Sequence, residues 1–185
     1  MSKLKYIMLL SIALFFIACG TDNDVNHDNR FDLWEYMTSS KSYDVEYDIY
    51  ENNRKTDYYR ETHRQYGDEY ERQSESGTTK LYLHSRNIIM NEPTGTVDID
   101  RFVYLGDKDI FHSPKLQLCT FEKFYDDYRT KNSTFYNVVQ IACTTKSGVY
   151  QEFYYGYNEG IVSLYEKDGN YEKEYVKVSE KEIYN

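Results

Sequence analysis

Cysteine and histidine side chains are the groups best suited to metal binding, redox chemistry or nucleophilic catalysis, and this chain has three cysteines and four histidines. The histidines, His27, His63, His84 and His112, are far apart in the sequence. His63 and His84 could meet across a sheet, but zinc needs a third protein ligand that the sequence does not indicate, and the HExxH motif is absent. We therefore interpret the histidines as unrelated surface residues and expect no metal site and no cofactor.

Motifs of enzyme active sites are also missing from the sequence. GxSxG, the P-loop and GxGxxG do not occur, and with 31 acidic residues a pair of neighbouring carboxylates carries no information about acid–base catalysis. The acidic run from Asp22 to Asp28 resembles a calcium loop, but its sixth and twelfth positions are His27 and Leu33 instead of glycine and glutamate. We expect a protein that is not an enzyme, and an uncharacterised hydrolase ranks third among the possible functions.

The amino terminus has the pattern of an export signal. Lys3 and Lys5 precede an apolar run over residues 6–17 that ends at Ala18 and Cys19. A positive start followed by a short apolar segment is typical of a secretory leader. A membrane-spanning helix would need about 20 apolar residues, more than this run supplies. The sequence predicts a leader over residues 1–18.

The last leader residues, Phe16, Ile17 and Ala18, together with Cys19, resemble the lipobox of bacterial lipoproteins. The resemblance covers the leader alone. It implies that the thiol of Cys19 receives a diacylglyceryl group, that the chain is cut before Cys19 and that the new amino terminus is acylated. Two or three acyl chains anchor a protein stably in a bilayer. The resemblance implies a location in the cell envelope. Because Gly20 stands where an aspartate favours retention in the inner membrane, the resemblance favours the outer membrane.

Length and charge limit the organisation of the chain and its partners. Cleavage would remove Lys3 and Lys5 and change the formal charge from -9 to -11, so nucleic acid is a poor partner. The length favours one domain. We expect a leader at 1–18, a lipidated Cys19 with a flexible acidic tether at 19–30, and a single β-rich domain at 31–185.

Two cysteines remain once Cys19 is assigned to the lipid. Cys119 and Cys143 are a disulfide candidate, because exported proteins meet an oxidising compartment. Such a bridge would stabilise the fold by about 3 kcal/mol on the chain-entropy model. Redox or metal chemistry is the alternative, but neither a CxxC motif nor a nearby histidine supports it.

The elements that would position these residues are mainly strands. Residues 31–37 have an Asp32-x-x-Glu35 capping box with Phe31 and Tyr36 as a hydrophobic staple, which predicts a short helix. Strict alternation from Tyr43 to Tyr50 predicts a strand with one apolar and one acidic face. Residues 57–66 continue the alternation, and in a hairpin their arginines, Arg60 and Arg64, could face that acidic row.

Turn signals recur through the rest of the chain. Glycines separate strand-like segments near residue 70 and at 80–83, 87–90, 97–105, 116–119, 138–143, 149–155, 161–165 and 171–178. Helical spacing of Phe121, Phe124, Tyr125 and Tyr128 predicts a second short helix. Residues 152–165 resemble the closing hairpin of exported β-rich bacterial proteins, which implies a half-open barrel as one candidate. The fold class expected is mainly β, an antiparallel meander forming a curved sheet, half-open barrel or sandwich with one or two short helices.

Tyrosine is unusually frequent, with 22 residues. Its ring packs well in strands, which explains most of them. The densest aromatic cluster is a candidate binding surface: Tyr150, Phe153, Tyr154, Tyr155 and Tyr157. Our first hypothesis is a non-catalytic envelope lipoprotein that binds a partner protein or a hydrophobic ligand at the membrane surface. The alternative is an immunity or inhibitor lipoprotein with an acidic binding face.

Overall fold

The computed structural model of the protein describes residues 30–183, which form antiparallel strands and one short helix. The helix is α2 (Leu33–Met37). The strands are β1 (Arg30–Asp32), β2 (Tyr43–Glu51), β3 (Arg54–Tyr66), β4 (Glu69–Ser74), β5 (Gly77–Leu83), β6 (Asn87–Glu92), β7 (Gly95–Asp100), β8 (Phe102–Tyr104), β9 (Phe111–His112), β10 (Leu116–Arg129), β11 (Thr134–Thr145), β12 (Tyr150–Gly156), β13 (Gly160–Asp168) and β14 (Tyr171–Glu182).

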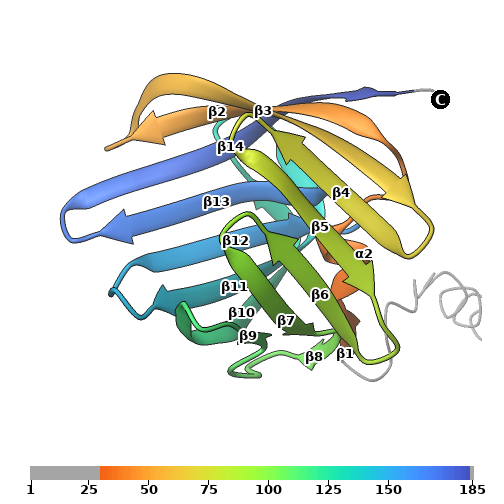
Figure 1. Ribbon diagram of the computed structural model, residues 1–185. Coiled ribbons are helices and arrows are strands. Elements are labelled where there is room, and N and C mark those ends of the chain that lie inside the picture. The colour runs from red at the N-terminus through yellow and green to blue at the C-terminus, as the bar shows by residue number, and fades with distance from the viewer. Residues whose placement is uncertain (1–29, 184–185) are drawn as a thin grey trace, which may run out of the picture.

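Twelve of the strands form one antiparallel sheet, in the order β10-β11-β12-β13-β14-β2-β3-β4-β5-β6-β7-β9. The sheet curls over so that β4 to β7 cross in front of β10 to β13, and β14, β2 and β3 connect the two layers (Figure 1). Its two edges meet through a bridge between Lys108 and Thr120 and a hydrogen bond from the Ile110 amide to the Cys119 carbonyl. The sheet is therefore a nearly closed barrel, which confirms the expected fold class.

Period-two alternation decides which face of each strand is buried. In β2, Tyr43, Val45 and Tyr47 point inward and are at most 3% exposed, as the sequence pattern predicts. The expected hairpin with β3 is present, in a register that pairs Glu46 with Arg60, and their charged groups lie 2.8 Å apart. Arg64 instead approaches Glu71 on β4, at 3.8 Å.

The helix α2 lies against one end of the barrel, near the turn between β12 and β13 (Figure 1). Asp32 caps it by accepting a hydrogen bond from the Trp34 amide at 3.1 Å, and the Phe31 and Tyr36 rings are in contact, as the capping box and staple predict. Tyr36 and Met37 are buried, and the Glu35 carbonyl accepts a hydrogen bond from the Asn158 amide of the turn. The first predicted helix is confirmed.

The second predicted helix is wrong. Residues 121–128 continue the strand β10 without a helical turn. A register shift between Phe121 and Lys123 changes the phase of alternation, so Phe121 and Phe124 pack in the main core while Tyr125 and Tyr128 pack in a separate cluster with Tyr154. The aromatic spacing that imitates a helix thus comes from a strand whose aromatic side chains pack on both of its faces.

The predicted leader, Cys19 and nearly all of the predicted tether lie outside the described residues. The last tether residue, Arg30, is already part of β1, where it pairs with Tyr104 of β8. Within residues 30–183, no helix is long and apolar enough to cross a membrane.

Candidate functional site

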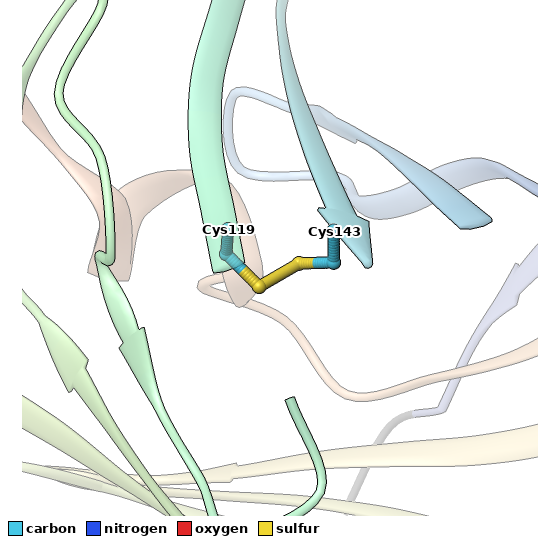
Figure 2. Close-up of a disulfide and its surroundings, with 2 residues drawn as sticks. All are labelled: Cys119 and Cys143. Carbon is cyan, nitrogen blue, oxygen red and sulfur yellow. A yellow bond between two sulfur atoms is a disulfide. The ribbon is translucent and has the colours of Figure 1, made fainter. Parts of the chain in front are cut away.

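A disulfide joins Cys119 on β10 to Cys143 on β11. The two residues face each other in the register of the strands with their Cα atoms 4.1 Å apart, and Figure 2 shows their side chains meeting between the two strands. Both residues are buried in the main core. The expected bridge is therefore present, and it leaves neither sulfur free for redox or metal chemistry.

A cavity of about 650 Å³ lies inside the barrel. Apolar and aromatic side chains on β2, β3, β12, β13 and β14 supply about half of the lining residues: Tyr47, Ile49, Tyr59, Phe153, Ile161, Leu164 and Tyr175. Gln151 and Thr145, at the end of β12 remote from α2, also line it. Along β2, β3 and β4, the fully buried Tyr43, His63 and Tyr70 lie between this cavity and α2, so that end is closed and the cavity is reached from the other.

A chain of hydrogen bonds crosses the closed end of the cavity. The Tyr59 hydroxyl donates to Glu61 at 2.9 Å, and Nε2 of His63 lies 2.7 Å from the other Glu61 oxygen. Nδ1 of His63 lies 2.7 Å from the Tyr70 hydroxyl, which in turn lies 3.2 Å from the hydroxyl of Tyr43. His63 and Tyr70 are both fully buried, so these bonds fasten β2, β3 and β4 together from inside.

Burial and hydrogen bonding set the charges of His63 and Glu61 in this series of hydrogen bonds. Burial lowers the pKa of His63, and the neighbouring Glu61 only partly opposes the effect, so His63 is neutral near pH 7. Burial alone would raise the pKa of Glu61, but the His63 hydrogen bond, the charge of Arg72 and the Tyr59 hydrogen bond outweigh it and lower the pKa. The neutral imidazole therefore donates from Nε2 to an ionised Glu61 and accepts the Tyr70 proton at Nδ1.

Arg72 on β4 is the other charged residue at this end of the cavity. It pairs with His63 in the strand register, on the same face as Tyr70, and it lines the cavity. Among the described residues, neither a hydrogen bond nor an ion pair within 4.0 Å engages its guanidinium, and its buried Nε has no partner. Burial alone would lower the pKa of Arg72, but the negative charge of Glu61 outweighs burial and raises it. The cavity therefore holds a permanent positive charge.

The predicted histidine positions separate in the structure. His63 is inside the barrel, so its expected place on the surface is wrong, while His84 and His112 are exposed and His27 lies outside the described residues. His84 follows the end of β5 and is not brought beside His63. In residues 30–183, no group of three histidine, cysteine or acidic side chains could hold a metal ion.

The aromatic cluster of β12 does not form one surface. Tyr150 and Tyr154 point outward, where both hydroxyls donate to the carboxylate of Glu152. Phe153 lines the cavity and Tyr155 belongs to the main core. Tyr157 is in the following turn and contacts Tyr36 of α2, with ring centroids 5.5 Å apart. Of the five residues, Phe153 alone lines the inner cavity.

Two further hollows are smaller. One, of about 280 Å³, is bordered by Tyr154, Glu152 and Tyr50, and the other, of about 420 Å³, by residues that include Arg60 and Glu46. Tyrosines and glutamates border most of the first, and charged and polar side chains border most of the second. The inner cavity is larger and has more apolar walls, so it is the better candidate for a ligand site.

Sequence reasoning missed Glu61, Tyr70 and Arg72 as parts of a site. One signal was available: if Arg60 faces the acidic side of β2, then Glu61 and His63 must alternate toward its apolar, buried side. A charged residue and a histidine opposite an apolar row indicate a polar cluster in the barrel interior. Arg72 gave no comparable signal, because the alternation of β4 is short and polar.

Comparison with known proteins supports the fold. No protein-family model matches the chain, and no curated protein matches its sequence. Among solved structures, the chain is similar to a protein from Bacteroides fragilis NCTC 9343 that is described as exported and as having a YmcC-like fold. The match has a TM-score of 0.52 and 14% identity, and it covers 79% of this chain and 98% of the other. The similarity is one of architecture.

Proposed function

We propose that this protein is a lipid-anchored envelope protein that holds a hydrophobic ligand in the cavity of its barrel, without catalysing a reaction. The observation that carries the proposal is the cavity itself. A solid interior would have left no place for such a ligand, whereas a volume of about 650 Å³ lies within the usual range of small-molecule sites, roughly 300–1,000 Å³.

The chemistry of the walls supports an apolar ligand. Ile49, Leu164 and Phe153 supply aliphatic and aromatic surface, and Tyr47 and Tyr175 add rings. Removal of apolar ligand surface from water contributes about 25 cal/mol per Å². The cavity is therefore suited to an acyl chain or a molecule of similar shape, and this supports a ligand over a partner protein as the bound species.

Burial of the His63 cluster supports binding over catalysis. Glu61, His63 and Tyr70 have the order of a carboxylate, an imidazole and a hydroxyl, which in hydrolases activates a nucleophile. Tyr70 is 0% exposed, and its hydroxyl is already engaged by Tyr43 and His63. A substrate cannot reach this oxygen without opening the barrel, so we assign the cluster a structural role.

The membrane location rests on the leader, with its resemblance to a lipobox ending at Cys19. The disulfide supports an oxidising compartment. Intact-mass analysis of membrane-extracted protein tests this part of the proposal. We expect a chain that begins at Cys19 with a diacylglyceryl group and an amide-linked acyl group, and a mature chain that begins at an unmodified residue would contradict it.

Ligand binding is tested with the neutral fluorescent probe N-phenyl-1-naphthylamine, titrated into the full chain in nanodiscs with protein-free nanodiscs subtracted. We expect saturable binding that Leu164→Trp weakens at least tenfold, because Leu164 lines the cavity. The matched control is Tyr165→Trp, at the adjacent position on the outer side of β13. Absence of saturable binding, or equal affinities in both variants, would refute the proposal.

A further inference from the structure

We propose that the ligand is an anionic amphiphile whose carboxylate or phosphate is received by Arg72. The inference rests on the proposed function and names the chemical class of its ligand. It is carried by the position of Arg72, which lines the cavity near its closed end and makes no hydrogen bond or ion pair with another described residue.

Arg72 is partly buried, and its Nε is fully buried without a hydrogen-bond partner among the described residues. A guanidinium has five N–H donors, and a charged group that leaves water is stabilised only when it is paired and hydrogen-bonded. The buried cation Lys177 meets this condition, because its Nζ lies 2.7 Å from Glu159, 2.7 Å from Glu180 and 3.2 Å from the Glu159 carbonyl. Arg72 has no such set of acceptors, so its donors remain available to a molecule in the cavity.

Glu61 does not act as a hydrogen-bond acceptor for Arg72. One of its oxygens accepts the Tyr59 hydroxyl and the other is bonded to His63, at 2.9 and 2.7 Å. No ion pair within 4.0 Å forms between Glu61 and Arg72. Glu61 thus holds Arg72 charged through space and leaves the fork of the guanidinium unoccupied, and such a fork matches a carboxylate or phosphate with two parallel hydrogen bonds.

The charge balance of the lining tolerates an added anion. The cavity is lined by three cations, Arg72, Lys115 and Lys173, and by two carboxylates, Glu61 and Glu92. This local excess of positive charge occurs in a chain whose formal charge is -9. An anion is therefore favoured inside the barrel although it is disfavoured by the protein as a whole.

The positions along the strands orient the ligand. Arg72 is two residues from the fully buried Tyr70 on β4, whereas Ser76, beyond the other end of the strand, lines the cavity from the turn that follows. The apolar walls extend from Arg72 toward that turn along β12, β13 and β14. The anionic head therefore lies at the closed end against Arg72, and the apolar tail lies toward the opening.

Paired fluorescent probes separate the head group from the tail. The full chain in nanodiscs is titrated with cis-parinaric acid and with its uncharged methyl ester, and protein-free nanodiscs are subtracted. The variants are Arg72→Met, which keeps an unbranched apolar side chain, and Arg64→Met, a control that removes an arginine from the outer side of β3. Competition by dodecanoate, dodecyl phosphate and dodecanol then distinguishes carboxylate from phosphate heads.

We expect the wild type and Arg64→Met to bind the acid at least tenfold more tightly than the ester. Arg72→Met should lose this preference while its affinity for the ester is unchanged, which also shows that the variant is folded. Equal affinities for acid and ester in the wild type, or a preference that survives in Arg72→Met, would overturn the role of Arg72 and leave the cavity as a site for neutral ligands. Failure of both probes to bind would overturn the proposed function itself.

Discussion

Substitution of Tyr70 by phenylalanine tests the buried hydrogen-bond chain. The hydroxyl that is removed lies 2.7 Å from Nδ1 of His63 and 3.2 Å from the hydroxyl of Tyr43. Because His63 is 0% exposed, water cannot replace the lost donor. A buried acceptor without a partner costs about 1–3 kcal/mol.

The expected loss is therefore about 2 kcal/mol in the free energy of unfolding, measured by equilibrium urea unfolding. For a domain of this size, 1 kcal/mol changes Tm by about 2–4 °C, so Tm should fall by about 4–8 °C in a thermal scan followed by circular dichroism. The matched control is Tyr66→Phe, because Tyr66 is 53% exposed. This control should stay within about 0.5 kcal/mol of the wild type.

A double-mutant cycle with His63→Leu isolates the contact. If Tyr70 and His63 are bonded, the double variant should be less destabilised than the sum of the two single variants by about 1 kcal/mol or more. Additivity within about 0.5 kcal/mol, together with a Tyr70→Phe variant as stable as Tyr66→Phe, would refute the bonded chain as a stabilising element.

Three further predictions follow from the fold. Replacement of Cys119 and Cys143 by alanine should lower the free energy of unfolding by about 3 kcal/mol or more, measured against the oxidised wild type in urea, and a loss below about 1 kcal/mol would contradict the bridge. Asp32→Ala removes both the cap of α2 and a two-point ion pair with Arg101, whereas Asp32→Asn keeps a capping oxygen. The alanine variant should therefore lose about 1 kcal/mol more free energy of unfolding than the asparagine variant in the same assay. Stability should fall on both sides of a plateau in pH. Because the pKa of His63 is lowered, the unfolded chain binds an extra proton below about pH 6.5, and the free energy of unfolding decreases there. The lowered pKa of Glu61 decreases it further below about pH 4.5. Burial raises the pKa of Tyr36 and Tyr128 to about 12, so the free energy of unfolding also decreases above about pH 10. His63→Leu should flatten the profile between pH 6.5 and 4.5, and an unchanged slope there would contradict this assignment.

Local patterns predicted the parts of the fold that depend on short stretches of chain. Alternation identified the buried face of β2 because Tyr43, Val45 and Tyr47 face one core, and the capping box identified α2 because its bonds span few residues. The spacing from Phe121 to Tyr128 misled because a register shift in β10 imitates helical periodicity. A bulge depends on the partner strand, and its position is not written in the strand that carries it.

The candidate site was less predictable than the fold. The walls of the cavity come from strands that are distant in sequence, and a charged residue such as Arg72 looks like a surface residue until its neighbours are known. The cluster of Tyr150 and Tyr154 drew attention by density along the chain, yet the next residues, Phe153 and Tyr155, point to the opposite side of the sheet. Residues that are adjacent in the sequence of a strand do not share one surface, because successive side chains point to opposite faces of the sheet.

The pairing of β14 with β2 determines when this fold can be completed. It joins Tyr43–Glu51, near the start of the described chain, to residues 173–182 at its end. Contacts of such long sequence separation slow folding, since the loop between them must close before the pairing contributes. A chain that emerges amino end first, from a ribosome or a translocation channel, leaves β2 without this partner until its last strand is free. Final assembly therefore waits until β14 is released, and until then β2 presents an unpaired strand edge.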